Sequence, residues 1–98
     1  MTNLPARKAE VADLALRIGV TAIDADWTGC DAVWPILERI RSEGAVVVIK
    51  LDGERRSRKY TVVISGEPLG EDFFRTDTAS LEEGLAAGIL FYAERRWN

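Results

Sequence analysis

The chain has 98 residues, of which 47% are hydrophobic and 30% charged, and its formal net charge at pH 7 is −3. This composition is typical of one globular domain and excludes disorder and a strongly basic nucleic-acid binder. Histidine is absent and Cys30 is the only cysteine, which excludes an internal disulfide, a multi-cysteine zinc site and histidine acid–base catalysis. No apolar run approaches the roughly 18–20 residues of a membrane span. Charges interrupt residues 1–16, where a signal peptide would be apolar, so we expect a cytoplasmic protein.

The first predicted helix covers residues 5–18. Pro5 suits the first position of a helix, and Gly19 is a plausible stop. The apolar residues follow helical spacing and are Val11, Leu14, Ala15 and Ile18. Residues 20–30 are expected to form a connecting loop, in which Val20 to Ile23 could be a short strand.

The second predicted helix covers residues 31–43 and carries an apolar stripe that ends at Ile40. Asp31 can cap its N-terminus. Pro35 is expected in the first turn, where its missing N–H costs least. Gly44 should end this helix.

Two apolar, β-branched runs follow, residues 45–51 and 60–64, and the polar loop 52–59 opens with Asp-Gly. This pattern predicts an antiparallel hairpin. Both faces of the first strand are apolar, and Val46, Val48 and Val63 should share the second face. Either the first helix or another chain must cover that face, and we expect a homodimer.

Residues 72–76 could form a third strand, and residues 80–96 are predicted to form the last helix. Ser80 and Glu83 have the spacing of a capping box. Gly84 and Gly88 lie on or beside the apolar stripe of this helix. Because glycine inside a helix costs about 1 kcal/mol relative to alanine, we expect the helix to press closely on the sheet there.

The predicted fold is therefore α+β, a two- or three-layer sandwich built on an antiparallel hairpin. It forms a single domain, residues 1–98, with its core in residues 31–96. From Asp31 onward the order resembles the α-β-β-β-α arrangement of double-stranded-RNA-binding domains. Residues 34–44 (WPILERIRSEG), the hairpin and residues 78–94 also resemble phage ABA sandwich domains, small phage-encoded proteins. That resemblance implies the fold and no established activity.

Asp24 and Asp26 belong to the segment DADWTG, which resembles the first motif of haloacid-dehalogenase-type phosphatases. In that family the first aspartate is the nucleophile and the second the acid/base, with magnesium bound between them. The segment also matches half of a calcium loop, but Pro35 stands where that loop needs glutamate. The simpler interpretation is that the aspartates solvate a turn, and we expect no metal or other cofactor.

Four basic residues gather at the hairpin tip: Arg55, Arg56, Arg58 and Lys59. They could contact phosphates, but Asp52 and Glu54 dilute the charge and no aromatic residue is interleaved for base stacking. Glu82 and Glu83 lie at the start of the predicted last helix, and their negative charges would repel a phosphate bound there. A solvated loop is the favoured interpretation.

Exposed aromatic residues favour protein contacts, and Trp97 has the best claim to exposure. The predicted interface is therefore formed by Val46, Val48, Val63 and Trp97. The leading hypothesis is a non-enzymatic, phage-type protein–protein interaction module. The alternatives are a nucleic-acid-associated module that uses the hairpin tip and a metal-dependent, phosphatase-like enzyme at Asp24 and Asp26.

Overall fold

The computed structural model describes residues 3–98. In these residues the elements are α1 (Leu4–Arg17), α2 (Gly29–Ser42), β1 (Ala45–Leu51), β2 (Tyr60–Gly66), a 3-10 turn (Glu67–Leu69), β3 (Phe74–Thr78) and α3 (Leu81–Arg96). The strands form an antiparallel sheet in the order β1-β2-β3. The predicted α+β fold class, the hairpin and the third strand are confirmed, although β3 begins two residues later than expected.

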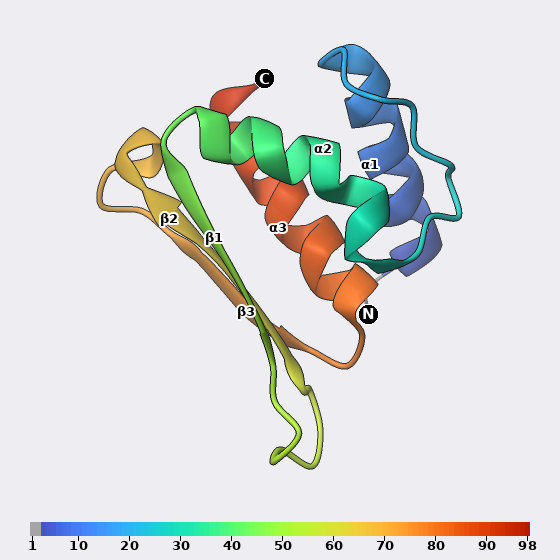
Figure 1. The fold of residues 1–98 in the computed structure, drawn as a ribbon, viewed down its shortest axis with the longest axis vertical. Coiled ribbons are helices and arrows are strands. Elements are labelled where there is room, and N and C mark those ends of the chain that lie inside the picture. The colour runs from blue at the N-terminus through green and yellow to red at the C-terminus, as the bar shows by residue number, and fades with distance from the viewer. Residues whose placement is uncertain (1–2) are drawn as a thin grey trace.

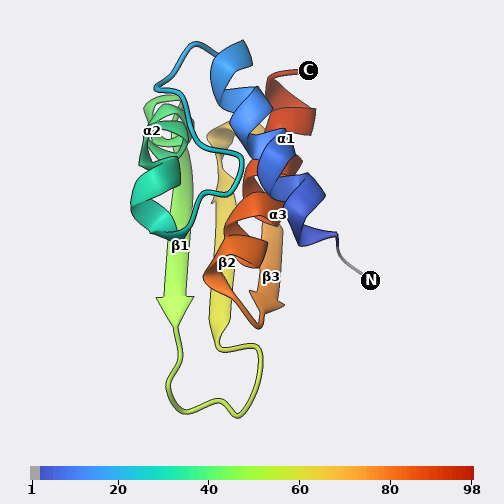
Figure 2. The ribbon, with the colours of Figure 1, turned by 90° about the vertical axis from the view of Figure 1, so that its right-hand side faces the viewer.

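All three helices lie on one side of the sheet (Figures 1 and 2). α2 packs on β1, α3 packs on β2 and β3, and α1 packs on α3. The alternative in which the first helix covers the second face of the sheet is therefore wrong. The apolar stripe of α1 is narrow, and its buried residues Val11, Leu14 and Ala15 belong to the core on the helix side.

The hydrophobic core lies between the sheet and the helices and extends into the contact between α1 and α3. It includes Val11, Leu14 and Trp27, which lie outside the predicted core of residues 31–96. At its centre Ile64 and Tyr92 are fully buried. Across residues 3–98 no helix combines the length and apolar character needed to span a bilayer.

The start of α2 differs from the prediction. The helix begins at Gly29, its N-cap is Thr28 rather than Asp31, and Pro35 consequently lies in the helix interior rather than in the first turn. Gly29 has a φ of +79°, which glycine adopts without strain. Its N–H donates to Glu82 Oε2 over 2.8 Å, so a carboxylate from the first turn of α3 replaces the expected Asp31 cap.

The segment between α1 and α2 contains no strand, contrary to one expectation for Val20 to Ile23. Trp27 organises this segment instead. Its indole Nε1–H donates to the carbonyl of Lys8 over 3.0 Å, and only 3% of the residue is exposed. The loop is thereby held against α1, away from any strand edge with which it could pair.

The close approach of α3 to the sheet is confirmed at both glycines. A Cβ at Gly84 would lie 2.9 Å from Val62 Cγ2 and 3.0 Å from Thr78 Oγ1. A Cβ at Gly88 would lie 3.1 Å from Ile64 Cδ1, the end of a flexible side chain, and 3.3 Å from both Phe74 Cε2 and Val62 Cγ1. Ser80 caps the helix as predicted, because its hydroxyl accepts from the Glu83 N–H.

We expect Gly84→Ala to lower the free energy of unfolding by about 1–2 kcal/mol, because the overpacking penalty exceeds the gain in helix propensity. Gly88→Ala should cost less than Gly84→Ala, because its nearest contact is the flexible end of Ile64 and none of its contacts is shorter than 3.1 Å. Urea denaturation of both variants measures the difference. A Gly84→Ala variant as stable as wild type would contradict the close approach.

Candidate functional site

The face of the sheet opposite the helices, hereafter the outer face, is uncovered in the described chain. The registers place three rows across it: Lys50, Thr61 and Asp77; Val48, Val63 and Arg75; Val46 and Ser65. The first row is polar and lies nearest the hairpin tip. The other end is rich in valine, so the outer face has a charged end and an apolar end.

The apolar end is open to solvent. Val46 is 53% exposed and Val48 is 48% exposed, while Val63 on the central strand is half-buried. All three lie on one face, as predicted. Valines on adjacent strands of an open sheet face form an apolar patch of the kind that marks an interface.

The charged end is a closed network rather than a set of free charges. Arg55 folds back from the hairpin loop, and its Nη1 donates to Asp77 Oδ1 over 2.9 Å. The Thr61 hydroxyl donates to the same oxygen. The Thr61 hydrogen bond and the Arg55 guanidinium lower the pKa of Asp77 to about 2. The charges at this end of the outer face are therefore paired with groups of the same chain.

An apolar groove runs beside β1 between that strand and α2. It has a volume of about 300 Å³ and is lined by Trp34, Leu37, Glu38, Arg41, Val47 and Ile49. We call it the β1 groove. Trp34 is exposed at its rim. The sequence predicted an apolar stripe on the second helix but gave no indication of this groove, which depends on β1 being an edge strand.

The free edge of β1 exposes backbone hydrogen-bonding groups. The N–H of Asp52 donates to the carbonyl of Lys59 over 2.8 Å. With the observed register, this bond shows which residue pairs of β1 and β2 are hydrogen-bonded and which are not. Because hydrogen-bonded and non-hydrogen-bonded pairs alternate, Val46, Val48 and Lys50 direct their backbone groups toward β2. Val47, Ile49 and Leu51 direct theirs toward the free edge, beside the β1 groove.

The basic hairpin tip is only partly available. Arg55 is paired with Asp77 and also lies 3.4 Å from Asp52. Arg56, Arg58 and Lys59 are exposed, in a loop that extends beyond the helices (Figure 1). The structure therefore separates the four predicted residues into one that holds the loop on the sheet and three that face solvent.

Asp24 and Asp26 form a turn. The Asp26 N–H donates to Asp24 Oδ1 and the Trp27 N–H donates to the Asp24 carbonyl, each over 3.1 Å. A side-chain oxygen that accepts from the residue two positions on is typical of an Asx turn. Throughout residues 3–98 there is no cluster of three or more acidic, cysteine or histidine side chains that could share a metal ion.

Trp97 is half-buried, so its predicted exposure is wrong. Its Nε1–H donates to Glu43 Oε2 over 2.8 Å, and its ring packs edge-on against Tyr92. The Tyr92 hydroxyl donates to Glu43 Oε1 over 2.6 Å. Burial opposes ionisation of Glu43, but the two hydrogen bonds together with the nearby charges of Arg39 and Arg96 outweigh it and lower its pKa. Burial and Glu43 raise the pKa of Tyr92 to about 12.

The thiol of Cys30 lies in the first turn of α2 and is half-buried. Burial, and then the neighbouring Asp31 carboxylate, raise its pKa. A raised pKa lowers the fraction of reactive thiolate. The balance of effects at this position therefore disfavours the thiolate, although the thiol lies in the first turn of a helix.

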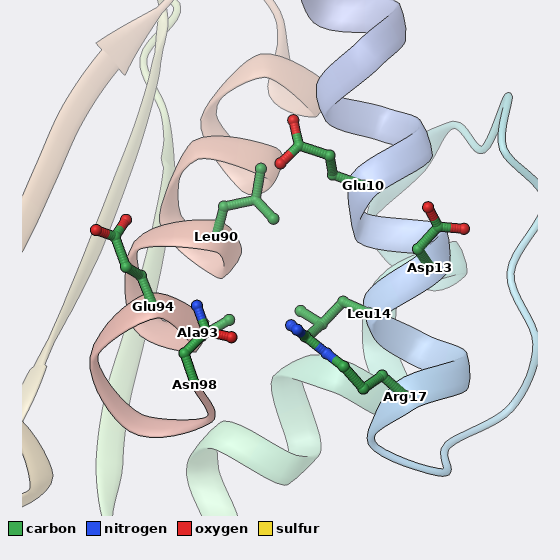
Figure 3. Close-up of a pocket in the computed structure, with 8 residues that line it drawn as sticks. All are labelled: Glu10, Asp13, Leu14, Arg17, Leu90, Ala93, Glu94 and Asn98. Carbon is green, nitrogen blue, oxygen red and sulfur yellow. The ribbon is translucent and has the colours of Figure 1, made fainter.

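A cleft with a volume of about 520 Å³ lies between α1 and α3 (Figure 3). Its lining includes three carboxylates, from Glu10, Asp13 and Glu94, and the guanidinium of Arg17. Figure 3 shows that the carboxylates point in different directions rather than toward a common centre. The arrangement is that of a solvated crevice between two helices.

No family model, curated protein or solved structure matches this chain. The resemblances to phage ABA sandwich domains and to double-stranded-RNA-binding domains remain predictions. The case for function therefore depends on the outer face, the free edge of β1 and the β1 groove.

Proposed function

We propose that the chain is a non-enzymatic protein–protein interaction module of the cytoplasm that acts through the outer face of its sheet. The observation that carries this proposal is the apolar end of the outer face, where Val46 and Val48 are about half exposed beside Val63. No helix of the described chain lies on that side of the sheet (Figure 1). Burial of such side chains is a principal favourable term in protein association.

Two observations favour protein contact over the nucleic-acid alternative. Arg55, the basic residue nearest the sheet, forms ion pairs with Asp52 and Asp77, and its charge is therefore already partly neutralised. The first turn of α3 contains Glu82 and Glu83, whose charges repel phosphate. Arg56, Arg58 and Lys59 remain as exposed charges that could assist an encounter with an acidic protein surface.

The observations at Asp24 and Asp26 favour a structural role over phosphatase-like chemistry. The Asp24 carboxylate accepts from the backbone of its own turn, and a magnesium site needs further oxygen ligands directed at the same point. The segment around these aspartates instead brings Trp27 into the core.

Val63→Lys tests the proposal, because it places a charge in the apolar end of the outer face without touching the edge of the sheet. Leu16→Lys is the matched control, since Leu16 is 67% exposed on α1, away from the sheet. In this experiment the immobilised chain is used to capture proteins from a lysate of its native host, and a captured protein is then purified so that its Kd can be measured directly. We expect Val63→Lys to weaken that binding at least tenfold, about 1.4 kcal/mol, and Leu16→Lys to leave it unchanged.

Circular dichroism and thermal unfolding must first show that both variants are folded. Equal affinities for Val63→Lys and Leu16→Lys would contradict the use of the outer face. Retention of nucleic acid at physiological salt, lost when Arg56 and Arg58 are neutralised, would instead favour the alternative function.

A further inference from the structure

The edge strand β1 is poorly protected against pairing with another strand. It has seven residues, of which six are apolar, and it contains no proline and no glycine. The opposite edge, β3, has five residues and carries Arg75 and Asp77. Edge strands are normally protected by charge, short length or a covering element. β3 has the first two of these, whereas β1 is longer and has a single charged residue, Lys50.

Burial along the helix-side face of β1 changes steadily from one end to the other. Ala45 is buried, Val47 and Ile49 are half-buried, and Leu51 is 67% exposed. Figure 2 shows why: α2 lies beside the N-terminal part of β1, and the other end of the strand extends beyond the helix. One half of this edge strand therefore lacks a cover that the other half possesses.

We propose that a second copy of this chain pairs with β1 as an antiparallel strand, about a two-fold axis at Val48. The two sheets then form one sheet of six strands. This inference rests on the proposed function, because it doubles the apolar outer face that a partner would bind. The pairing is a strand addition, in which backbone hydrogen bonds provide the affinity.

The register follows from the strand itself, because centring the axis on Val48 pairs all of residues 45–51. Val47 then lies opposite Ile49 of the second copy, and both direct their backbone groups into the new ladder. The two-fold axis also places Leu51, at the uncovered end of β1, beside the start of β1 in the second copy. That part of the strand is covered by α2 of the second copy. The two α2 helices avoid each other, since each lies at the opposite end of the paired strands.

The charges near β1 are compatible with a second copy. Lys50 is the only charged residue of the strand, and its ammonium lies 3.4 Å from the Asp52 carboxylate. In the proposed register Lys50 lies opposite Val46 of the second copy, and the two lysines are separated by about 14 Å. At the rim of the β1 groove Glu38 and Arg41 neutralise each other over 3.0 Å. Neither Lys50 nor the groove charges therefore oppose the pairing.

Cysteine cross-linking tests the register directly in a Cys30→Ser background. Val48 and Val48 of the second copy form a non-hydrogen-bonded pair with Cα atoms about 4.5 Å apart, within the range that a disulfide spans. We expect Val48→Cys to give a disulfide-linked dimer under mild oxidation. Val46→Cys should not, because the two copies of residue 46 are about 14 Å apart. Val63→Cys is the control for a face-to-face dimer.

Light scattering of the unmodified chain should give twice the mass of one chain at high micromolar concentration, and Val48→Asp should give a folded monomer. A monomer mass for the wild type would overturn the inference. So would cross-linking of Val46→Cys or Val63→Cys in preference to Val48→Cys. A monomeric wild type whose partner binding still depends on Val63 would overturn the dimer and leave the proposed function intact.

Discussion

Trp27→Ala is expected to lower the free energy of unfolding by about 3–5 kcal/mol, the usual range for removing a large buried aromatic side chain. Trp27 belongs to the core although it lies in the connection between two helices. Its indole donates to the Lys8 carbonyl, and the Lys8 ammonium lies 5.6 Å from the ring centre. Removing the ring would detach the connection from α1 and leave a cavity.

Phe73→Ala is the matched control for this experiment, because Phe73 is an aromatic residue with 59% of its surface exposed. It should cost less than about 1 kcal/mol. Urea denaturation followed by circular dichroism, at one protein concentration, compares the two variants. Equal losses at Trp27 and Phe73 would show that the connection is not anchored as described.

Glu43→Ala should lower the free energy of unfolding by about 2 kcal/mol, because it removes the hydrogen-bond acceptor of the hydroxyl of the fully buried Tyr92. It also removes the acceptor of the Trp97 indole N–H and so breaks the hydrogen-bonded link between the end of α2 and the end of α3. In the Glu43→Ala background Tyr92→Phe should cost little further, since the hydroxyl has already lost its acceptor. A double-mutant cycle measures this coupling, and additive effects would contradict it.

The same carboxylate gives the stability a dependence on pH. The hydrogen bonds to Glu43 lower its pKa in the folded chain, in spite of burial. Its contribution is therefore complete above the unfolded pKa of about 4.3 and is lost as the pH falls through the lower, folded pKa. Asp77 acts in the same direction. Measuring the free energy of unfolding against pH for the wild type and for Glu43→Gln isolates the Glu43 contribution. In the variant, the part of the acid-induced loss of stability that is due to Glu43 should be absent.

The sequence was sufficient to predict the sheet and the last helix, because local patterns determine both. β-branched runs on either side of a polar loop indicate a hairpin, and the two helical glycines have little purpose unless a strand lies close by. The open second face of β1 was also visible in its sequence, since Val46 and Val48 alternate with Val47 and Ile49 on the opposite face.

The remaining features depend on contacts between residues far apart in the chain. The hydrogen bond between Trp27 and Lys8 joins two elements, and the cap of α2 comes from Glu82, which follows it by 53 positions. No local pattern indicates either partner. The sequence was equally unable to predict on which side of the sheet α1 lies. Its short apolar stripe can pack on α3 as well as it could pack on a sheet.

The most direct test of the interface is amide hydrogen exchange at Val47 and Ile49, whose N–H groups point toward the free edge of β1. At high protein concentration we expect these two amides to exchange as slowly as the central strand β2, and to exchange faster on dilution. Amides at the outer edge of β3 should not respond to concentration. Fast exchange of Val47 and Ile49 at every concentration would contradict the pairing of β1 with a second strand.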